Sequence, residues 1–157
     1  MRVLVNIFIV LCGCGCATRP ELVVTHSPNP CDVHHAKAFR KDPFPFMWYY
    51  RTEVQNKSSR PIQITSFEGY FFVDGKWISK NVLHRKLTSQ DFSKWYSEGV
   101  AVTNGWIPAG GVAVCDPNWH GSRTPTSPRC KWTFVGVDAE GRTFQAEAEI
   151  ETLPIKR

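Results

Sequence analysis

The side chains best suited to chemistry lie in a polar stretch between Asp116 and Ser122. This stretch brings a carboxylate, an imidazole and a hydroxyl close together in the chain, at Asp116, His120 and Ser122. These are the groups of a hydrolytic triad, in which a base activates a hydroxyl nucleophile. However, His120 and Ser122 are only two residues apart, and no nucleophile-elbow or oxyanion-hole pattern accompanies them. We therefore predict that the protein is not an enzyme, and a hydrolase using His120 and Asp116 is the least favoured hypothesis.

The same stretch is also suited to binding. Trp119 places an indole beside His120, and Trp106 is a second tryptophan that we expect in a loop. Binding residues lie disproportionately on loops that a rigid scaffold carries, and flat indole faces stack well on sugar rings. We predict that Trp106, Asp116, Trp119 and His120 belong to a surface for a ligand or partner. The competing interpretation is that Trp119 simply packs over the end of the domain.

A third cluster, from Cys31 to His35, has the composition of a metal site. It contains one thiol, Asp32 and two adjacent imidazoles, and such ligands suit zinc or copper. Adjacent histidines on a regular element rarely bind one ion together, and the chain has neither a Cys-x-x-Cys pair nor a Cys-x-x-Cys-His motif. We therefore predict no metal ion and no cofactor.

The N-terminus has the features of a secretory signal peptide. Arg2 supplies a positive charge, and residues 3–11 are apolar except for Asn6. This apolar run is well short of the ~20 residues that cross a bilayer as a helix. An export signal is therefore favoured over a membrane-spanning helix.

The end of this segment, Leu11-Cys12-Gly13-Cys14, resembles the lipobox of bacterial lipoproteins. The resemblance implies that residues 1–13 are a lipoprotein signal peptide and that Cys14 becomes the lipidated N-terminus, anchored by several acyl chains. Gly15, where inner-membrane lipoproteins carry Asp, implies the cell envelope and its outer membrane, facing the periplasm or the exterior. Two alternatives stay open: cleavage near Ala17 by an ordinary signal peptidase, giving a soluble secreted protein, or an uncleaved segment.

Composition permits one packed domain of ordinary size. The chain has 157 residues, of which 42% are hydrophobic and 13% aromatic. Its net charge is +5, and loss of Arg2 leaves 18 basic and 14 acidic residues, or 18 − 14 = +4. Export argues against nucleic acid as a partner. We expect attachment to the membrane through the lipid anchor, and an envelope protein or a cell-wall polymer as partner.

Four cysteines remain after cleavage and lipidation, and an oxidising compartment favours disulfides between them. Four cysteines allow three pairings. We favour Cys115–Cys130, because both lie in the expected domain and bracket one loop, whose closure contributes about 3 kcal/mol. Cys16–Cys31 would be a second bridge.

The chain is expected to consist of three parts. Residues 1–13 form the signal peptide, residues 14–45 form the lipidated cysteine and an extended Pro-rich tether, and residues 46–157 form the domain. Within the domain, alternation of apolar and polar residues predicts several strands and a helix that starts after Ser89 as N-cap and ends before Gly99. Asp74-Gly75 predicts a two-residue hairpin, and residues 116–129 read as a long loop. The expected strands are 47–55, 62–73, 76–79, 100–102, 112–115, 131–137 and 142–151.

Two segments resemble bacterial immunoglobulin-like domains. Residues 54–64 are similar to their early hairpin, and Ile107-Pro108-Ala109-Gly110-Gly111 to a later turn. The resemblance implies an all-β fold, an antiparallel immunoglobulin-like β-sandwich with one short helix. The leading hypothesis is therefore a membrane-anchored lipoprotein that acts as a non-catalytic accessory or protein-interaction module. The alternative is a lipoprotein that binds carbohydrate or peptidoglycan through Trp106, Trp119 and His120.

Overall fold

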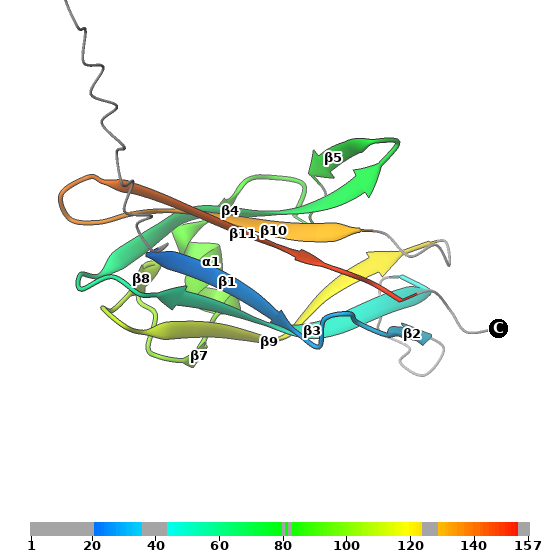
Figure 1. Cartoon of the computed structure of the whole chain (residues 1–157), viewed down its shortest axis with the longest axis horizontal. Helices are drawn as coiled ribbons and strands as arrows, with labels where there is room; N and C mark the ends of the chain where they lie inside the picture. Colours follow the sequence, from blue (N-terminus) through cyan, green and yellow to red (C-terminus); the bar gives the residue numbers. More distant parts are fainter. Residues whose placement is uncertain (1–20, 36–43, 80, 82, 124–128, 154–157) are drawn as a thin grey trace, which may run out of the picture.

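Antiparallel strands make up most of the described chain (Figure 1). The computed structural model describes residues 21–35, 44–79, 81, 83–123 and 129–153. Within these ranges the strands form two sheets and the chain has one short helix, α1 (Ser89–Trp95). The prediction of an all-β, antiparallel fold with a short helix is confirmed.

The two sheets lie one above the other in Figure 1, and α1 lies at the end that carries β8. The first sheet has the order β1 (Leu22–Ser27), β3 (Phe46–Asn56), β9 (Val112–Ser122) and β7 (Glu98–Gly99), with β2 (Val33–His35) also paired to β3. The second has the order β11 (Thr143–Ile150), β10 (Cys130–Val137), β4 (Ile62–Val73) and β5 (Lys76–Ser79), with β6 (Leu87–Thr88) and β8 (Trp106–Ile107) also paired to β4.

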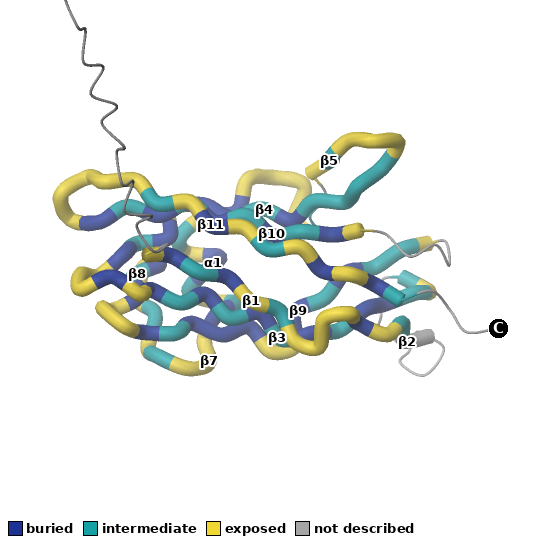
Figure 2. The backbone as a smooth tube through the Cα atoms, viewed as in Figure 1, coloured by how far each residue is buried: buried dark blue, intermediate teal, exposed yellow. Residues whose placement is uncertain are grey.

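The core lies where the two sheets face each other. Successive side chains of a strand point to opposite faces, and along β3 the inward residues Trp48, Tyr50 and Val54 are buried while Tyr49 and Arg51 are half-buried. Strands of both sheets contribute to one hydrophobic cluster, and buried positions recur along both layers in Figure 2. Removal of this apolar surface from water is the main force that holds the sheets together.

The first sheet begins earlier than the sequence predicted. Residues 21–33 were expected in the tether, but β1 pairs with β3 along its whole length, and Leu22 and Val24 are buried. Cys31 is also buried, and its backbone N–H donates to the Glu151 carbonyl at 2.8 Å. The prolines at 28 and 30 follow the strand and mark the turn after it, not an extended tether. The rest of the predicted tether lies largely outside the described residues.

β9 is also longer than expected, because residues 116–122 are strand and not loop. The register between β3 and β9 shifts between Tyr50 and Thr52, opposite Cys115 and Asn118. An extra residue of this kind is a β-bulge, and a bulge accommodates Pro117, which has no N–H for the ladder. Polar residues at the buried positions Asn118 and His120 hid the alternation of this strand.

The other local predictions were mostly correct. Asp74 and Gly75, with φ of 48° and 78°, form the predicted hairpin turn between β4 and β5. The helix N-cap is Thr88 and not Ser89: its hydroxyl accepts from the Asp91 N–H, and the Asp91 carboxylate accepts from the Thr88 N–H at 2.9 Å. The strand predicted at 100–102 is instead the two-residue β7 just before it.

The predicted disulfide between Cys115 and Cys130 is absent. These cysteines lie on β9 and β10, in different sheets, and no disulfide forms among the described cysteines, which are all buried. Cys16, the predicted partner of Cys31, lies outside the described residues. So do Cys14 and the signal segment. Within the described ranges, no helix has the length and apolar character needed to cross a bilayer.

Candidate functional site

The four residues predicted for a binding surface fall at different places. Trp106 lies on β8, which pairs with the first residues of β4. Asp116, Trp119 and His120 all lie on β9, but Trp119 and His120 line a cleft that Asp116 does not. The structure therefore brings together two of the four.

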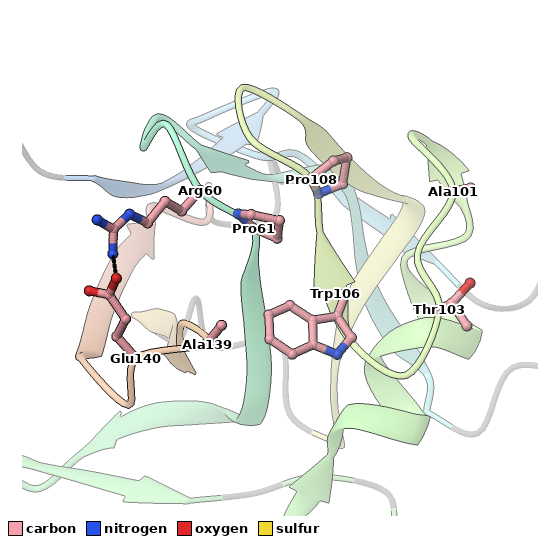
Figure 3. A pocket seen from close by; sticks show the side chains of 8 residues that line it. All are labelled: Arg60, Pro61, Ala101, Thr103, Trp106, Pro108, Ala139 and Glu140. Carbon is pink, nitrogen blue, oxygen red and sulfur yellow. Dashed lines mark ion pairs between the residues drawn. The ribbon is translucent and has the colours of Figure 1, made fainter.

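Trp106 lies in a separate shallow pocket of about 650 Å³ (Figure 3). Its half-buried indole lies below Pro61 and Pro108 in this view, and an ion pair between Arg60 and Glu140 lies at one side of the pocket. The surface around the indole is mostly apolar. The pocket offers a stacking face, with few side chains that would orient a polar ligand.

Asp116 is exposed at the bulge of β9 and faces Arg51. The distance between Arg51 Nη1 and Asp116 Oδ2 is 3.4 Å, and Arg51 also bonds to Glu53 at 2.8 Å. Exposed pairs of this kind contribute little to stability. No hydrogen bond links Asp116 to His120, so the carboxylate and imidazole of the predicted triad do not act on each other.

His120 is buried and belongs to a chain of aromatic hydrogen bonds. Trp132 donates from Nε1 to the Tyr50 hydroxyl at 2.7 Å, and that hydroxyl lies 2.5 Å from His120 Nδ1. Because Tyr50 accepts from Trp132, its own proton is available for Nδ1. This arrangement favours the tautomer in which Nδ1 accepts and Nε2 carries the proton, because a proton on Nδ1 would leave the buried Tyr50 hydroxyl proton without an acceptor in this network.

The imidazole of His120 is neutral at ordinary pH. Burial lowers the pKa of His120 to about 3, and nearby His26 adds to the lowering. A general base is most effective with a pKa near the working pH, and this one is far below it. The sequence did not single out Tyr50 and Trp132, because the hydrogen-bonded residues are far apart in the chain. Tyr50 is 70 residues from His120, and Trp132 is 82 residues from Tyr50.

His120 Nε2 is buried and has no hydrogen-bond partner among the described residues. Two other buried side-chain atoms share this property, Trp48 Nε1 and the Tyr96 hydroxyl. Such groups are rare in folded proteins, because an unsatisfied buried donor loses its bonds to water without replacement. Each of these three atoms therefore needs an explanation, and for His120 Nε2 the relevant feature is the cleft that this residue lines.

A second polar network links the two sheets beside the first. His26 Nδ1 lies 2.9 Å from the Thr52 hydroxyl, and its Nε2 lies 3.2 Å from the Ala148 carbonyl. Asn118 also donates to the Thr52 hydroxyl at 2.9 Å. Burial lowers the pKa of His26 to about 4, although the bond to Ala148 opposes the shift. This network ties β1, β3, β9 and β11 together and is structural.

The cleft that His120 and Trp119 line has a volume of about 2070 Å³. The cleft opens at the edge of the first sheet where β9 has no neighbouring strand. β7 pairs with β9 only at Ala113 and Val114, and no described strand covers that edge beyond Val114. β4 and β10 form the opposite wall, and part of the rim is formed by Ser79, Asn81, His84, Arg85 and Lys86. The incomplete edge of the first sheet therefore exposes part of the interior.

The lining of the cleft is both aromatic and polar. Its rings include Phe44, Phe71, Phe72, Trp95, Trp119 and Trp132. Its polar side chains include Glu68, Ser79, Asn81, Asn118 and Ser122, and its cations include Lys86 and Arg123. Apolar walls with a few polar groups that fix orientation are typical of small-molecule sites. In the described part of the chain, no three His, Cys, Asp or Glu side chains are placed to hold a metal ion.

Comparisons with known proteins do not identify a family. No family model matches the chain, and no curated protein matches it. Among solved structures, a protein named ApaA from Bordetella pertussis matches at 14% identity and a TM-score of 0.49, covering 85% of this chain and 96% of that one. A structural-genomics target, SoR45, matches at 12% identity and a TM-score of 0.48, covering 87% and 93%. Similarity at this level indicates no function.

Proposed function

We propose that the protein is a lipid-anchored lipoprotein of the cell envelope whose β domain is a non-catalytic accessory or protein-interaction module. The observation that carries the anchor is the stretch Leu11-Cys12-Gly13-Cys14, directly after a short apolar segment. Gly15 supports location at the outer membrane. The lipid would hold the domain at a surface, so its partners would be envelope proteins or the cell wall.

Metabolic palmitate labelling tests the anchor. We expect label on the wild type, a mature N-terminus at Cys14, and loss of label in Cys14→Ser. Cys12→Ser is the matched control and should keep the label, because this residue is removed with the signal. Label retained by Cys14→Ser, or a mature chain that begins at Thr18, would reject the lipoprotein. Membrane fractionation then tests the outer-membrane location.

The non-catalytic role is supported by the arrangement around His120. Its imidazole is neutral and bonded to Tyr50, while Asp116 pairs with Arg51. A hydrolase using His120 and Asp116 would need these two groups to cooperate. A screen of ester and peptide substrates tests this: activity abolished by Asp116→Asn would overturn the proposal.

A second candidate function, binding of carbohydrate or peptidoglycan, is favoured by the mixed lining of the cleft. Trp119 and His120 belong to this cleft, and Trp106 belongs to a different pocket. Retention on insoluble peptidoglycan should therefore decrease for Trp119→Ala and remain for Trp106→Ala. No retention of the wild type, or equal loss in both variants, would count against binding through the cleft.

We also propose that the two facing sheets form an immunoglobulin-like β-sandwich. The support is the antiparallel pairing and the resemblance of residues 54–64 and 107–111 to such domains. The true immunoglobulin spacing of Cys, Trp and Cys is missing from the sequence. A crystal structure of the full chain in which the strand order of either sheet differs from the one given above would reject this assignment.

A further inference from the structure

We propose that the cleft binds an N-acetylated sugar and that His120 donates a hydrogen bond from Nε2 to the carbonyl of the acetamido group. This inference rests on the carbohydrate-binding function proposed above and names the chemical group that is recognised. It starts from a buried donor with no protein partner, in a residue that lines the cleft.

The type of donor restricts the type of ligand. Trp132 donates to Tyr50, and in the favoured tautomer Tyr50 donates to Nδ1, so that the ring donates from Nε2. The ligand atom must therefore be an acceptor. A carboxylate beside Nε2 is a poor fit, because the imidazole stays neutral and the rings of Tyr50, Phe71 and Trp132 around it carry no charge that would compensate a buried anion. A neutral carbonyl oxygen satisfies the donor without that penalty.

The surroundings of the donor restrict the rest of the group. The ring of Phe71 meets the imidazole edge-on at a centroid distance of 5.0 Å, and the ring of Trp132 lies 5.9 Å away. The imidazole is therefore surrounded by aromatic rings, which favour an apolar substituent next to the carbonyl. An acetamido group combines a carbonyl oxygen with a methyl group.

The outer part of the cleft is suited to a sugar ring. Trp119 is half-buried and lies with Phe44 at a centroid distance of 6.3 Å, so both offer flat apolar faces. Rim side chains supply donors and acceptors for hydroxyl groups: Glu68, Ser79, Asn81 and Ser122. Glu68 and Asn81 already bond to each other at 2.6 Å, so a sugar would extend an existing polar network. A hydrocarbon chain would cover these polar groups without replacing their bonds to water, which favours a sugar over an acyl ligand.

The open edge of β9 is poorly suited to a peptide strand. Strand addition requires free backbone N–H and C=O groups along the edge. Pro117 has no N–H, and the N–H of Trp119 already donates to the Asn118 side chain at 2.8 Å. These features are typical of edges protected against pairing. A small ligand in the cleft is therefore favoured over a strand along it.

The test uses the full lipidated chain in lipid nanodiscs, titrated by calorimetry with two probes, the N-acetylated trimer of glucosamine and the same trimer without acetyl groups. We expect the acetylated trimer to bind at least tenfold tighter. His120→Phe should weaken that binding about tenfold, equivalent to about 1.4 kcal/mol. His120→Gln, whose amide N–H can occupy the position of Nε2, should retain part of it, and Trp106→Ala should not change it.

A measurement on the wild type keeps the test valid even if a variant does not fold. NMR of the imidazole nitrogens should show the proton on Nε2, and the Nε2–H resonance should shift when the acetylated trimer is added. A proton on Nδ1, or no shift at saturation, would overturn the inference. So would equal affinity for both trimers, or His120→Phe binding as tightly as the wild type.

The remaining outcomes separate this inference from the proposed functions. If dodecanoate binds and shifts the Nε2–H resonance while the trimers do not, the ligand is an acyl chain and the inference is wrong. If neither trimer binds but the protein is retained on peptidoglycan through Trp119, carbohydrate binding stands and the acetamido contact is rejected. If both assays fail, both ideas fail, and palmitate labelling still decides the anchor independently.

Discussion

Replacement of Tyr50 by Phe should destabilise the domain strongly, although it removes a single oxygen atom. Tyr50 is buried on β3, and its hydroxyl joins Trp132 on β10 to His120 on β9. It is therefore a polar connection between the two sheets. Phe would fill nearly the same volume, so the change isolates the hydrogen bonds from the packing.

The expected magnitude follows from the groups left behind. Without the hydroxyl, Trp132 Nε1 loses its acceptor and His120 Nδ1 loses its donor, and both remain buried. An unsatisfied buried group costs about 1–3 kcal/mol. Partial relaxation of the side chains reduces the sum, and we expect a decrease of about 2–4 kcal/mol in the free energy of unfolding. For a domain of this size that corresponds to a melting temperature lower by roughly 8–16 °C.

Tyr96→Phe is the matched control. The Tyr96 hydroxyl is also buried but makes no hydrogen bond to the described residues. Burial raises the pKa of Tyr96, and Cys115 adds to the rise. The Thr52 hydroxyl opposes it, but that hydroxyl already bonds to His26 and Asn118 and is not placed for a well-formed hydrogen bond to Tyr96. Removing a hydroxyl that is already unsatisfied relieves a desolvation penalty. We expect this variant to be as stable as the wild type or more stable by up to about 1 kcal/mol.

Urea denaturation of both variants, followed by tryptophan fluorescence and circular dichroism, measures the difference. Two probes are needed because the variants alter the surroundings of several tryptophans. A loss below about 1 kcal/mol for Tyr50→Phe, or a larger loss for Tyr96→Phe than for Tyr50→Phe, would refute the hydrogen-bond assignment and with it the tautomer of His120.

Three further predictions concern pH, backbone strain and thiols. The folded pKa values of His26 and His120, about 4 and about 3, lie below the ordinary 6.5, so the unfolded chain binds more protons between these values. The free energy of unfolding should therefore fall as the pH drops from about 6.5 toward 4, by up to about 1.4 kcal/mol per pH unit for each histidine. Urea denaturation at a series of pH values measures this fall, and His26→Gln should show a smaller change in the free energy of unfolding per pH unit. Gly105→Ala should be less stable than Gly110→Ala by about 1–3 kcal/mol in the same assay, because both have positive φ but only the methyl at 105 would meet a backbone oxygen, at 2.6 Å. Iodoacetamide should modify the three described cysteines slowly in the native protein and rapidly after unfolding, because they are buried and burial raises the pKa of Cys115 to about 12; fast native labelling would contradict this.

Much of the fold could be predicted because its long strands have a clear pattern. Alternation along residues 47–55 and the Asp74-Gly75 turn determined β3 and the hairpin of β4 and β5. The prediction failed where local signals conflicted with tertiary structure. Residues 21–33 were assigned to the tether because of the prolines at 28 and 30, although Leu22 and Val24 are buried against the rest of the domain.

The candidate site could be predicted only in part. Trp119 and His120 were selected by residue type, and both line the cleft. The cleft itself depends on where β7 stops pairing with β9, and no local pattern encodes that limit. The partners of His120, Tyr50 and Trp132, come from other strands, and their long separation in the chain hides the contact.

The location of the unsatisfied groups separates a packing defect from a binding site. Three buried side-chain atoms lack a partner among the described residues, on Trp48, Tyr96 and His120. Only His120 is among the residues that line the cleft. If all three were defects of packing, their replacement by Phe would affect stability alone. If the cleft is a site, Tyr96→Phe should change stability without changing ligand affinity, whereas His120→Phe should change ligand affinity, because His120 lines the cleft and Tyr96 does not.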